Sequence, residues 1–86
     1  MSKEDQFIYN DADKARISAA IPSIKRLPGG SATQTYDVVL NPSVDVTDTE
    51  IFDRCNGGLH FKNSTFGGKV RRSADGKSAV VQIYID

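Results

Sequence analysis

The chain has 86 residues, of which 38% are hydrophobic and 26% are charged, with 11 basic and 11 acidic side chains. This length provides for one domain, predicted over residues 1–86, with a core only just large enough to fold alone. The composition is well away from that of disordered proteins. Because the formal net charge is zero, no overall field draws the protein to DNA or to an anionic membrane, and any affinity for polyanions must be local.

The N-terminal residues Met1 to Gln6 lack the basic and apolar regions of a secretory signal. No stretch reaches the roughly 18 consecutive apolar residues that a membrane span needs. The single cysteine, Cys55, has no partner for an internal disulfide, as is typical of proteins in reducing compartments. These observations predict a cytoplasmic protein with no membrane partner.

The first predicted element is an alanine-rich helix over residues 11–20, capped by Asn10 or Asp11. Pro22 ends it, because the residue before a proline disfavours the α conformation. Residues 23–27 are too short a segment to distinguish a strand from a loop.

A turn follows at Pro28-Gly29-Gly30-Ser31. Beyond it, Tyr36, Val38 and Leu40 alternate with polar residues, which predicts a strand over residues 35–41 that Pro42 ends.

The best-specified local signal is the capping box Thr47-Asp48-Thr49-Glu50, with Val46 and Ile51 at the positions of a hydrophobic staple. It predicts a helix over residues 48–55, which Asn56-Gly57 ends. Acidic residues in the first turn favour the positive end of the helix dipole. We therefore interpret Asp48 and Glu50 as structural residues rather than as metal ligands or catalytic groups.

The next predicted strand covers residues 59–63, with Leu59 and Phe61 facing the core and His60 and Lys62 facing outward. A loop containing Phe66 then leads to the C-terminal segment.

The C-terminal residues 68–86 are predicted to form a β-hairpin closed by a two-residue turn at Asp75-Gly76. This turn pairs Ala74 with Lys77 and sets the register of the two strands. Because successive strand residues point to opposite faces, the register defines an inward and an outward set. The inward set is Val70, Ala79, Val81, Ile83 and Ile85, and the outward set is Lys69, Arg71, Val80, Gln82 and Tyr84.

Together these elements predict a small α+β domain in the order α-β-β-α-β-β-β. Its antiparallel sheet has four to five strands, the last three forming a meander, and two helices pack on one face of the sheet.

If the strand over residues 59–63 lies beside the hairpin, cations, an amide and aromatic rings gather around one open sheet face. The candidate binding residues are Lys62, Phe66, Lys69, Arg71, Gln82 and Tyr84. Cations that track phosphates and rings that stack on bases are typical of surfaces for single-stranded nucleic acid. Tyrosine and arginine are equally typical of protein interfaces. A solvated face whose cations prevent edge-to-edge pairing is the third interpretation.

Catalytic and metal-binding patterns are weak. Cys55 and His60 are five residues apart but lack an orienting third group. The acidic residues from Asp45 to Asp53 miss the glycine and the terminal glutamate of a calcium loop. The glycine pairs do not have the spacing of a phosphate-binding loop. We expect no enzyme activity, catalytic residue, metal or cofactor.

The sequence therefore predicts a non-enzymatic binding protein that acts through a protein–protein interface, such as a phage or mobile-element accessory factor or an inhibitor of a larger host complex. The interface is expected on the basic face or on the acidic segment over residues 37–53, imitating nucleic-acid phosphates. Binding of single-stranded nucleic acid by the hairpin is the alternative. A structural or assembly subunit that self-associates through the edge of the C-terminal strand is the second alternative.

Overall fold

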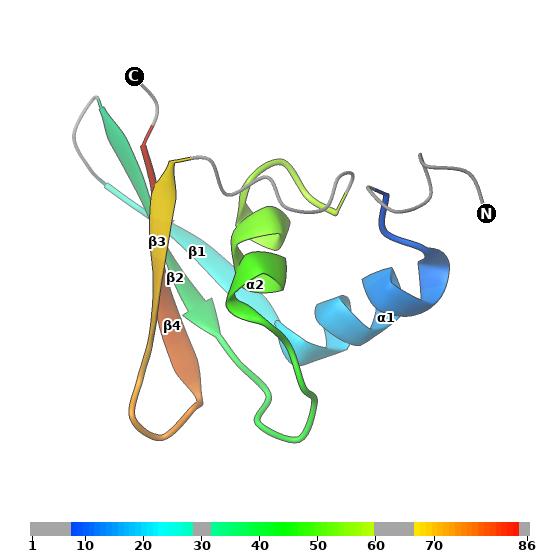
Figure 1. The fold of residues 1–86 in the computed structure, drawn as a ribbon. Coiled ribbons are helices and arrows are strands. Elements are labelled where there is room, and N and C mark those ends of the chain that lie inside the picture. Colours follow the sequence, from blue (N-terminus) through cyan, green and yellow to red (C-terminus); the bar gives the residue numbers. More distant parts are fainter. Residues whose placement is uncertain (1–7, 29–31, 60–66, 85–86) are drawn as a thin grey trace.

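The computed structural model describes residues 8–28, 32–59 and 67–84. Two helices pack on one side of a four-stranded antiparallel sheet (Figure 1), which confirms the predicted α+β class. The elements are α1 (Asp11–Ala20), β1 (Ser23–Leu27), β2 (Thr33–Val39), α2 (Asp48–Cys55), β3 (Gly68–Arg72) and β4 (Ser78–Tyr84). The strand predicted over residues 59–63 lies, apart from Leu59, outside the described residues.

Helix α1 begins where its sequence provides a cap. The side-chain oxygen of Asn10 accepts a hydrogen bond from the backbone N–H of Asp13 at 2.7 Å, which satisfies one of the free donors of the first turn. The helix ends at Ala20, ahead of Pro22. Ile17 and Ala20 are fully buried, so α1 contributes a narrow apolar edge to the core.

Helix α2 has the predicted capping box. The Thr47 hydroxyl accepts from the N–H of Glu50 at 3.1 Å, and the Glu50 carboxylate accepts from the N–H of Thr47 at 2.9 Å. Ile51 is fully buried and Val46 packs against the same core, as a hydrophobic staple requires. After Cys55 the chain turns away through Gly57, whose φ of 83° is a left-handed conformation that glycine adopts without strain.

The strand order is β1-β2-β4-β3, with all neighbours antiparallel. The C-terminal strand β4 is therefore central, because β2 pairs with one side of it and β3 with the other. The prediction that the C-terminal strand presents a free edge is wrong over residues 78–84. The edge strands are β1 and β3.

Strand β2 begins and ends two residues earlier than predicted, at Thr33 and Val39. The N–H of Asn41 donates to the carbonyl of Ala20 at 2.8 Å, so the end of α1 takes the hydrogen bond that would have extended the strand. The predicted inward face is confirmed, since Val38 and Leu40 are buried and Tyr36 packs against the core.

The hairpin register is confirmed: Lys69 pairs with Gln82, Val70 with Val81, Arg71 with Val80 and Arg72 with Ala79. The turn itself is longer than predicted. The N–H of Ser73 donates to Ser78 at 2.9 Å, and the N–H of Gly76 donates back to Ser73 at 3.1 Å, so Ala74 and Lys77 belong to the turn instead of pairing in the ladder. The predicted two-residue turn and the longer observed turn are both centred on Asp75-Gly76. The strand register is therefore the same for both.

The core lies between the helices and the inner face of the sheet. Its largest fully buried side chains are Phe52, Ile17, Ile51, Val38, Val81 and Asp53. Ala79 and Ile83 of β4 are also buried, and Val70 packs against them, as the register predicts for these described members of the inward set.

Gly68 provides a test of this packing. A Cβ atom at Gly68 would overlap the Phe52 ring and the carbonyl oxygen of Gln82. We expect Gly68→Ala to lower the free energy of unfolding by about 1–3 kcal/mol, the usual cost of overpacking, as measured by urea denaturation. Gly67→Ala is the matched control, because its Cβ would lie 3.6 Å from the Tyr84 carbonyl oxygen, an ordinary contact. Equal stability of the two variants would contradict the packing of β3 against α2.

Candidate interaction surface on the open face of the sheet

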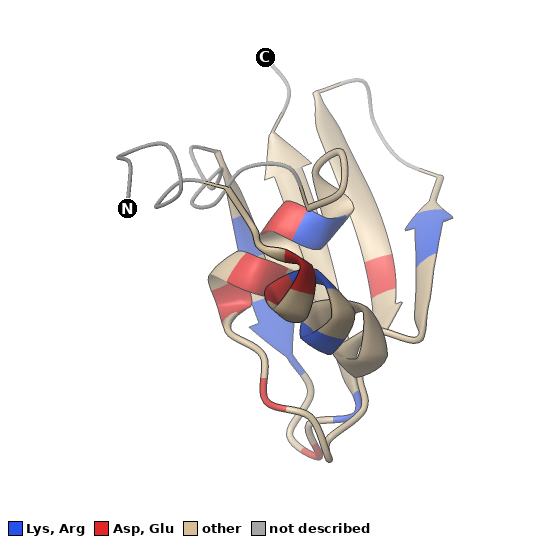
Figure 2. Cartoon of the chain, turned by 90° about the vertical axis from the view of Figure 1, so that its right-hand side faces the viewer, with Lys and Arg blue, Asp and Glu red and all other residues tan. Residues whose placement is uncertain are grey.

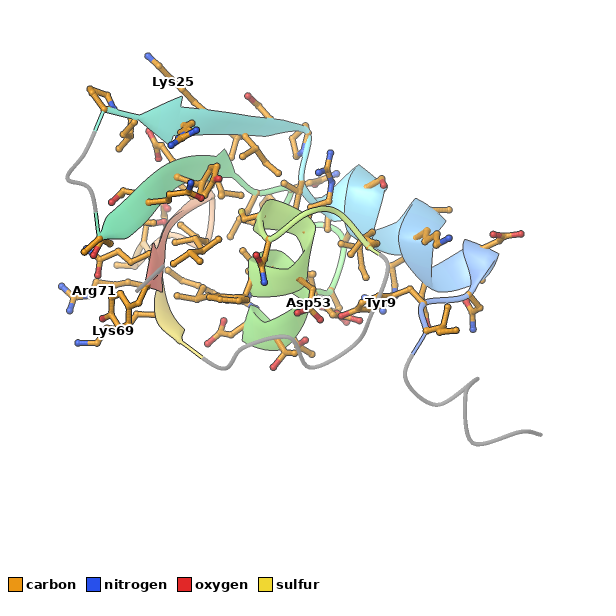
Figure 3. All side chains as sticks on the ribbon, turned by 90° about the horizontal axis from the view of Figure 1, so that it is seen from above. Tyr9, Lys25, Asp53, Lys69 and Arg71 are labelled. Atoms are coloured by element: carbon orange, nitrogen blue, oxygen red, sulfur yellow. The ribbon has the colours of Figure 1, made fainter. Side chains whose placement is uncertain are left out.

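The helices cover one face of the sheet and leave the opposite face open. Residues paired across an antiparallel sheet lie on the same face, so the registers identify the members of this open face. In the view from above, α2 lies on one side of the sheet while Lys69 and Arg71 project on the other (Figure 3). The open face consists of Ser23, Lys25 and Leu27 of β1, Thr33, Thr35, Asp37 and Val39 of β2, Ser78, Val80, Gln82 and Tyr84 of β4, and Lys69 and Arg71 of β3.

Exposed apolar side chains are concentrated on the open face. Four large hydrophobic residues in the described part of the chain are exposed: Val39 at 48%, Ile8 at 42%, Val80 at 41% and Tyr84 at 40%. All but Ile8 belong to the open face. Val39 is opposite Ser78, two residues before Val80, so the two valines are diagonal neighbours across β2 and β4.

Charge on the open face is mainly positive. Lys25 is opposite Asp37, but Arg71 is opposite Val80 and Lys69 is opposite Gln82. Within the described ranges, neither Lys69 nor Arg71 forms an ion pair. The positive charges of Lys69 and Arg71 are therefore not neutralised by the residues opposite them in β4.

The sequence-predicted binding residues are thus partly brought together. Lys69, Arg71 and Tyr84 are exposed on the open face, and Gln82 is half-buried between them. Lys62 and Phe66 lie outside the described residues. Sequence reasoning missed Lys25, Asp37 and Val39, because it did not determine which strands lie beside the hairpin.

Acidic side chains are mainly on the helix side of the molecule. Viewed from that side, the helices carry most of the acidic residues, whereas the strands are mainly basic (Figure 2). Asp37 is the one acidic residue within the described strands.

Two of these acids are neutralised by arginines. The two terminal guanidinium nitrogens of Arg16 donate hydrogen bonds to the Glu50 carboxylate, at 3.0 and 2.5 Å. This hydrogen bonding lowers the pKa of the Glu50 carboxyl. Asp48 accepts from Nε of Arg72 at 2.7 Å. The acidic segment over residues 37–53 accordingly does not present a row of free carboxylates, which weakens the phosphate-mimicry interpretation.

A third acid, Asp53, is fully buried. The hydroxyl of Tyr9 donates a short hydrogen bond to its Oδ2 atom, and the two residues lie beside each other in Figure 3. Burial, together with this hydrogen bond, raises the pKa of the Tyr9 phenol well above its ordinary value of 10.0. The pair links Tyr9, two residues before α1, to the second half of α2.

A cleft of about 480 Å³ lies between the loop that follows β2 and the start of α2, lined by Arg16 and Arg72 among others. Both guanidinium groups already contact the carboxylates described above, so neither arginine offers the cleft an unpaired positive charge. No cluster of three or more potential metal-ligating side chains occurs in the part of the chain that the structure describes.

Cys55 is not positioned as a nucleophile. It is 8% exposed, and burial raises the pKa of its thiol to about 11, so the thiol stays protonated near neutral pH. His60, which the sequence suggested as a catalytic partner for Cys55, lies outside the described residues.

Comparison with models of protein families, with curated protein sequences and with solved structures finds no match to this chain. None of the described helices is long and apolar enough to cross a membrane. Function must therefore be argued from the chemistry of the open face.

The Tyr9–Asp53 pair predicts a dependence of stability on alkaline pH. The raised pKa keeps Tyr9 protonated in the folded state, whereas the unfolded tyrosine ionises near 10.0. Stability is therefore complete below that pH and decreases as the pH rises beyond it. We expect Tyr9→Phe to lower the free energy of unfolding by about 1.5–3 kcal/mol at neutral pH and to weaken the alkaline dependence. Denaturation curves measured across this pH range would contradict the pairing if the two proteins lost stability in parallel.

Cys55 predicts slow thiol chemistry in the folded protein. At about pH 8, we expect Ellman's reagent to react with the native thiol on the order of a hundredfold more slowly than with urea-unfolded protein. Cys55→Ser provides the blank. Rapid reaction of the native protein would contradict a buried, protonated thiol.

Proposed function

We propose that this protein is a non-enzymatic binding protein that docks a protein partner on the open face of its sheet. The observation that carries the proposal is the gathering of Val39, Val80 and Tyr84, all at least 40% exposed, on the face that the helices leave uncovered.

The chemistry of the face supports a protein partner. Its three exposed large apolar side chains lie on the two central strands, β2 and β4, while Lys25, Lys69 and Arg71 lie on the two edge strands. An apolar centre with a polar margin is the usual arrangement of a protein interface, and tyrosine and arginine are enriched among the residues that dominate binding energy. A small binder of this kind acts as an accessory factor or an inhibitor by occupying a surface of a larger complex. The single cysteine, Cys55, has no second cysteine with which to form an internal disulfide, which suits the reducing cytoplasm, where we place the protein.

Binding of single-stranded nucleic acid is the second candidate, because Lys69, Arg71 and Tyr84 share the face. Phosphate contacts and base stacking would use these groups. Asp37 and Val80 occupy the row between Lys25 and Arg71, where a phosphate backbone would meet a carboxylate and an apolar side chain. This arrangement favours the protein partner.

The test is capture of partners by the immobilised full chain, followed by mass spectrometry. We expect Val80→Asp to abolish capture of a specific protein, because it places a charge on the open face beside the exposed Val39. Ile8→Asp is the matched control, since Ile8 is equally exposed but precedes α1, away from the open face. Circular dichroism verifies that both variants fold.

Retention of the same protein by wild type and Val80→Asp would overturn the proposal. So would capture of nothing but nucleic acid, with an affinity for labelled oligonucleotides that decreases steeply as salt is added.

A further inference from the structure

Within residues 8–28, 32–59 and 67–84, the outer edge of β3 has backbone groups that no strand pairs. Backbone hydrogen bonds join Tyr84 to Gly67 and Ser73 to Ser78, each at 2.9 Å, which makes the odd-numbered residues of β3 the ones bonded to β4. Gly68, Val70 and Arg72 therefore direct their N–H and C=O groups away from the sheet. No described strand pairs with this side of β3.

The second edge, β1, is less suited to accept another strand. It is flanked by Pro22 and Pro28, which cannot donate backbone hydrogen bonds and so limit a pairing to the residues between them. Its outward cation, Lys25, is opposite Asp37, so its charge is partly offset. The β3 edge has two outward cations, Lys69 and Arg71, with no acidic residue opposite either of them.

These cations determine which strand β3 can accept. Antiparallel pairing of two β3 strands around Val70 would put Lys69 of each copy opposite Arg71 of the other, and like charges directly opposite each other are destabilising. A second copy of the chain is therefore a poor occupant. A strand with carboxylates at those two positions would form opposite-charge pairs instead.

We propose that the β3 edge binds an extended acidic segment of a partner protein, which adds a fifth strand to the sheet. Acidic residues at alternating positions of this segment face Lys69 and Arg71. The residues between them face the helix side of the sheet, beside Val70. The one cation of β3 on that side, Arg72, is already paired with Asp48, so these positions suit apolar side chains. The inference rests on the proposed function and names the partner's chemistry: the added strand lies next to the open face and continues its surface.

The test uses a labelled synthetic peptide that alternates glutamate with valine or threonine, titrated into the full chain and followed by fluorescence anisotropy and NMR. We expect saturable binding, with slower hydrogen exchange at the amides of Val70 and Arg72, which point outward. The same peptide N-methylated at alternate residues, so that its donors toward β3 are removed, should not bind.

Variants test the charge requirement. The double variant Lys69→Glu/Arg71→Glu should weaken binding roughly tenfold or more, because two attractive cross-strand pairs become repulsive. Lys14→Glu/Arg26→Glu is the matched control, with the same change in net charge at exposed positions outside both β3 and the open face, and should bind nearly as well as wild type.

Equal binding of a scrambled or lysine-containing peptide would overturn the proposal, as would binding without protection of Val70 and Arg72. A concentration-dependent dimer in sedimentation that Lys69→Glu alone strengthens, because it puts a carboxylate opposite Arg71 of the other copy, would identify a second copy as the occupant and overturn it too. Capture of a protein that depends on Val80 but is unaffected by K69E/R71E would overturn the acidic-strand inference while leaving the proposed function intact. Capture that neither Val80→Asp nor K69E/R71E alters, together with absence of peptide binding, would overturn both proposals.

Discussion

The antiparallel pairing of β2 with β4 is the interaction on which the rest of the structure depends. It joins seven consecutive residue pairs, from Thr33 with Tyr84 to Val39 with Ser78, across a long stretch of intervening chain. Closing so large a loop costs conformational entropy that local contacts do not recover. The pairing is stabilised because alternate side chains on its helix-facing side, including Val38 of β2 and Val81 of β4, are buried in the core. Once it forms, β1 and β3 can only be edge strands.

The helix layer and the sheet divide the charge of a neutral protein between them. Arg16 links α1 to the cap of α2 through Glu50, and Arg72 links β3 to the first turn of α2 through Asp48. These contacts pair two acids in the first turn of α2 with arginines of the same chain. Lys69 and Arg71 of β3 have no such partners within the described residues. A zero net charge therefore says little about the chemistry that this protein presents on one face.

Local features of this fold were predictable from sequence because each depends on residues close together in the chain. The capping box at Thr47, the stop at Gly57 and the inward and outward sets of the hairpin are of this kind. The hairpin register was predicted correctly from a turn of the wrong length, since it depends on the centre of the turn.

Features that depend on distant residues were not predictable in this way. Arg16 and Glu50 are 34 residues apart, and Tyr9 and Asp53 are 44 apart, so no periodicity indicates either contact. The same limitation applies to the candidate site. Lys69, Arg71 and Tyr84 were found from alternation within one hairpin, whereas Val39 and Lys25 join the face through the strand order alone.

Cations on an edge strand are commonly interpreted as a device against aggregation, and that interpretation fits β3. Lys69 and Arg71 make pairing of two β3 edges unfavourable, which protects the chain from association with its own copies. The same repulsion keeps a second copy of β3 from the N–H and C=O groups of Gly68, Val70 and Arg72, which no described strand pairs. The positive charge that makes pairing with a second copy unfavourable also makes pairing with an acidic strand favourable. The protective and the binding roles thus require the same two residues, and the presence of one is no argument against the other.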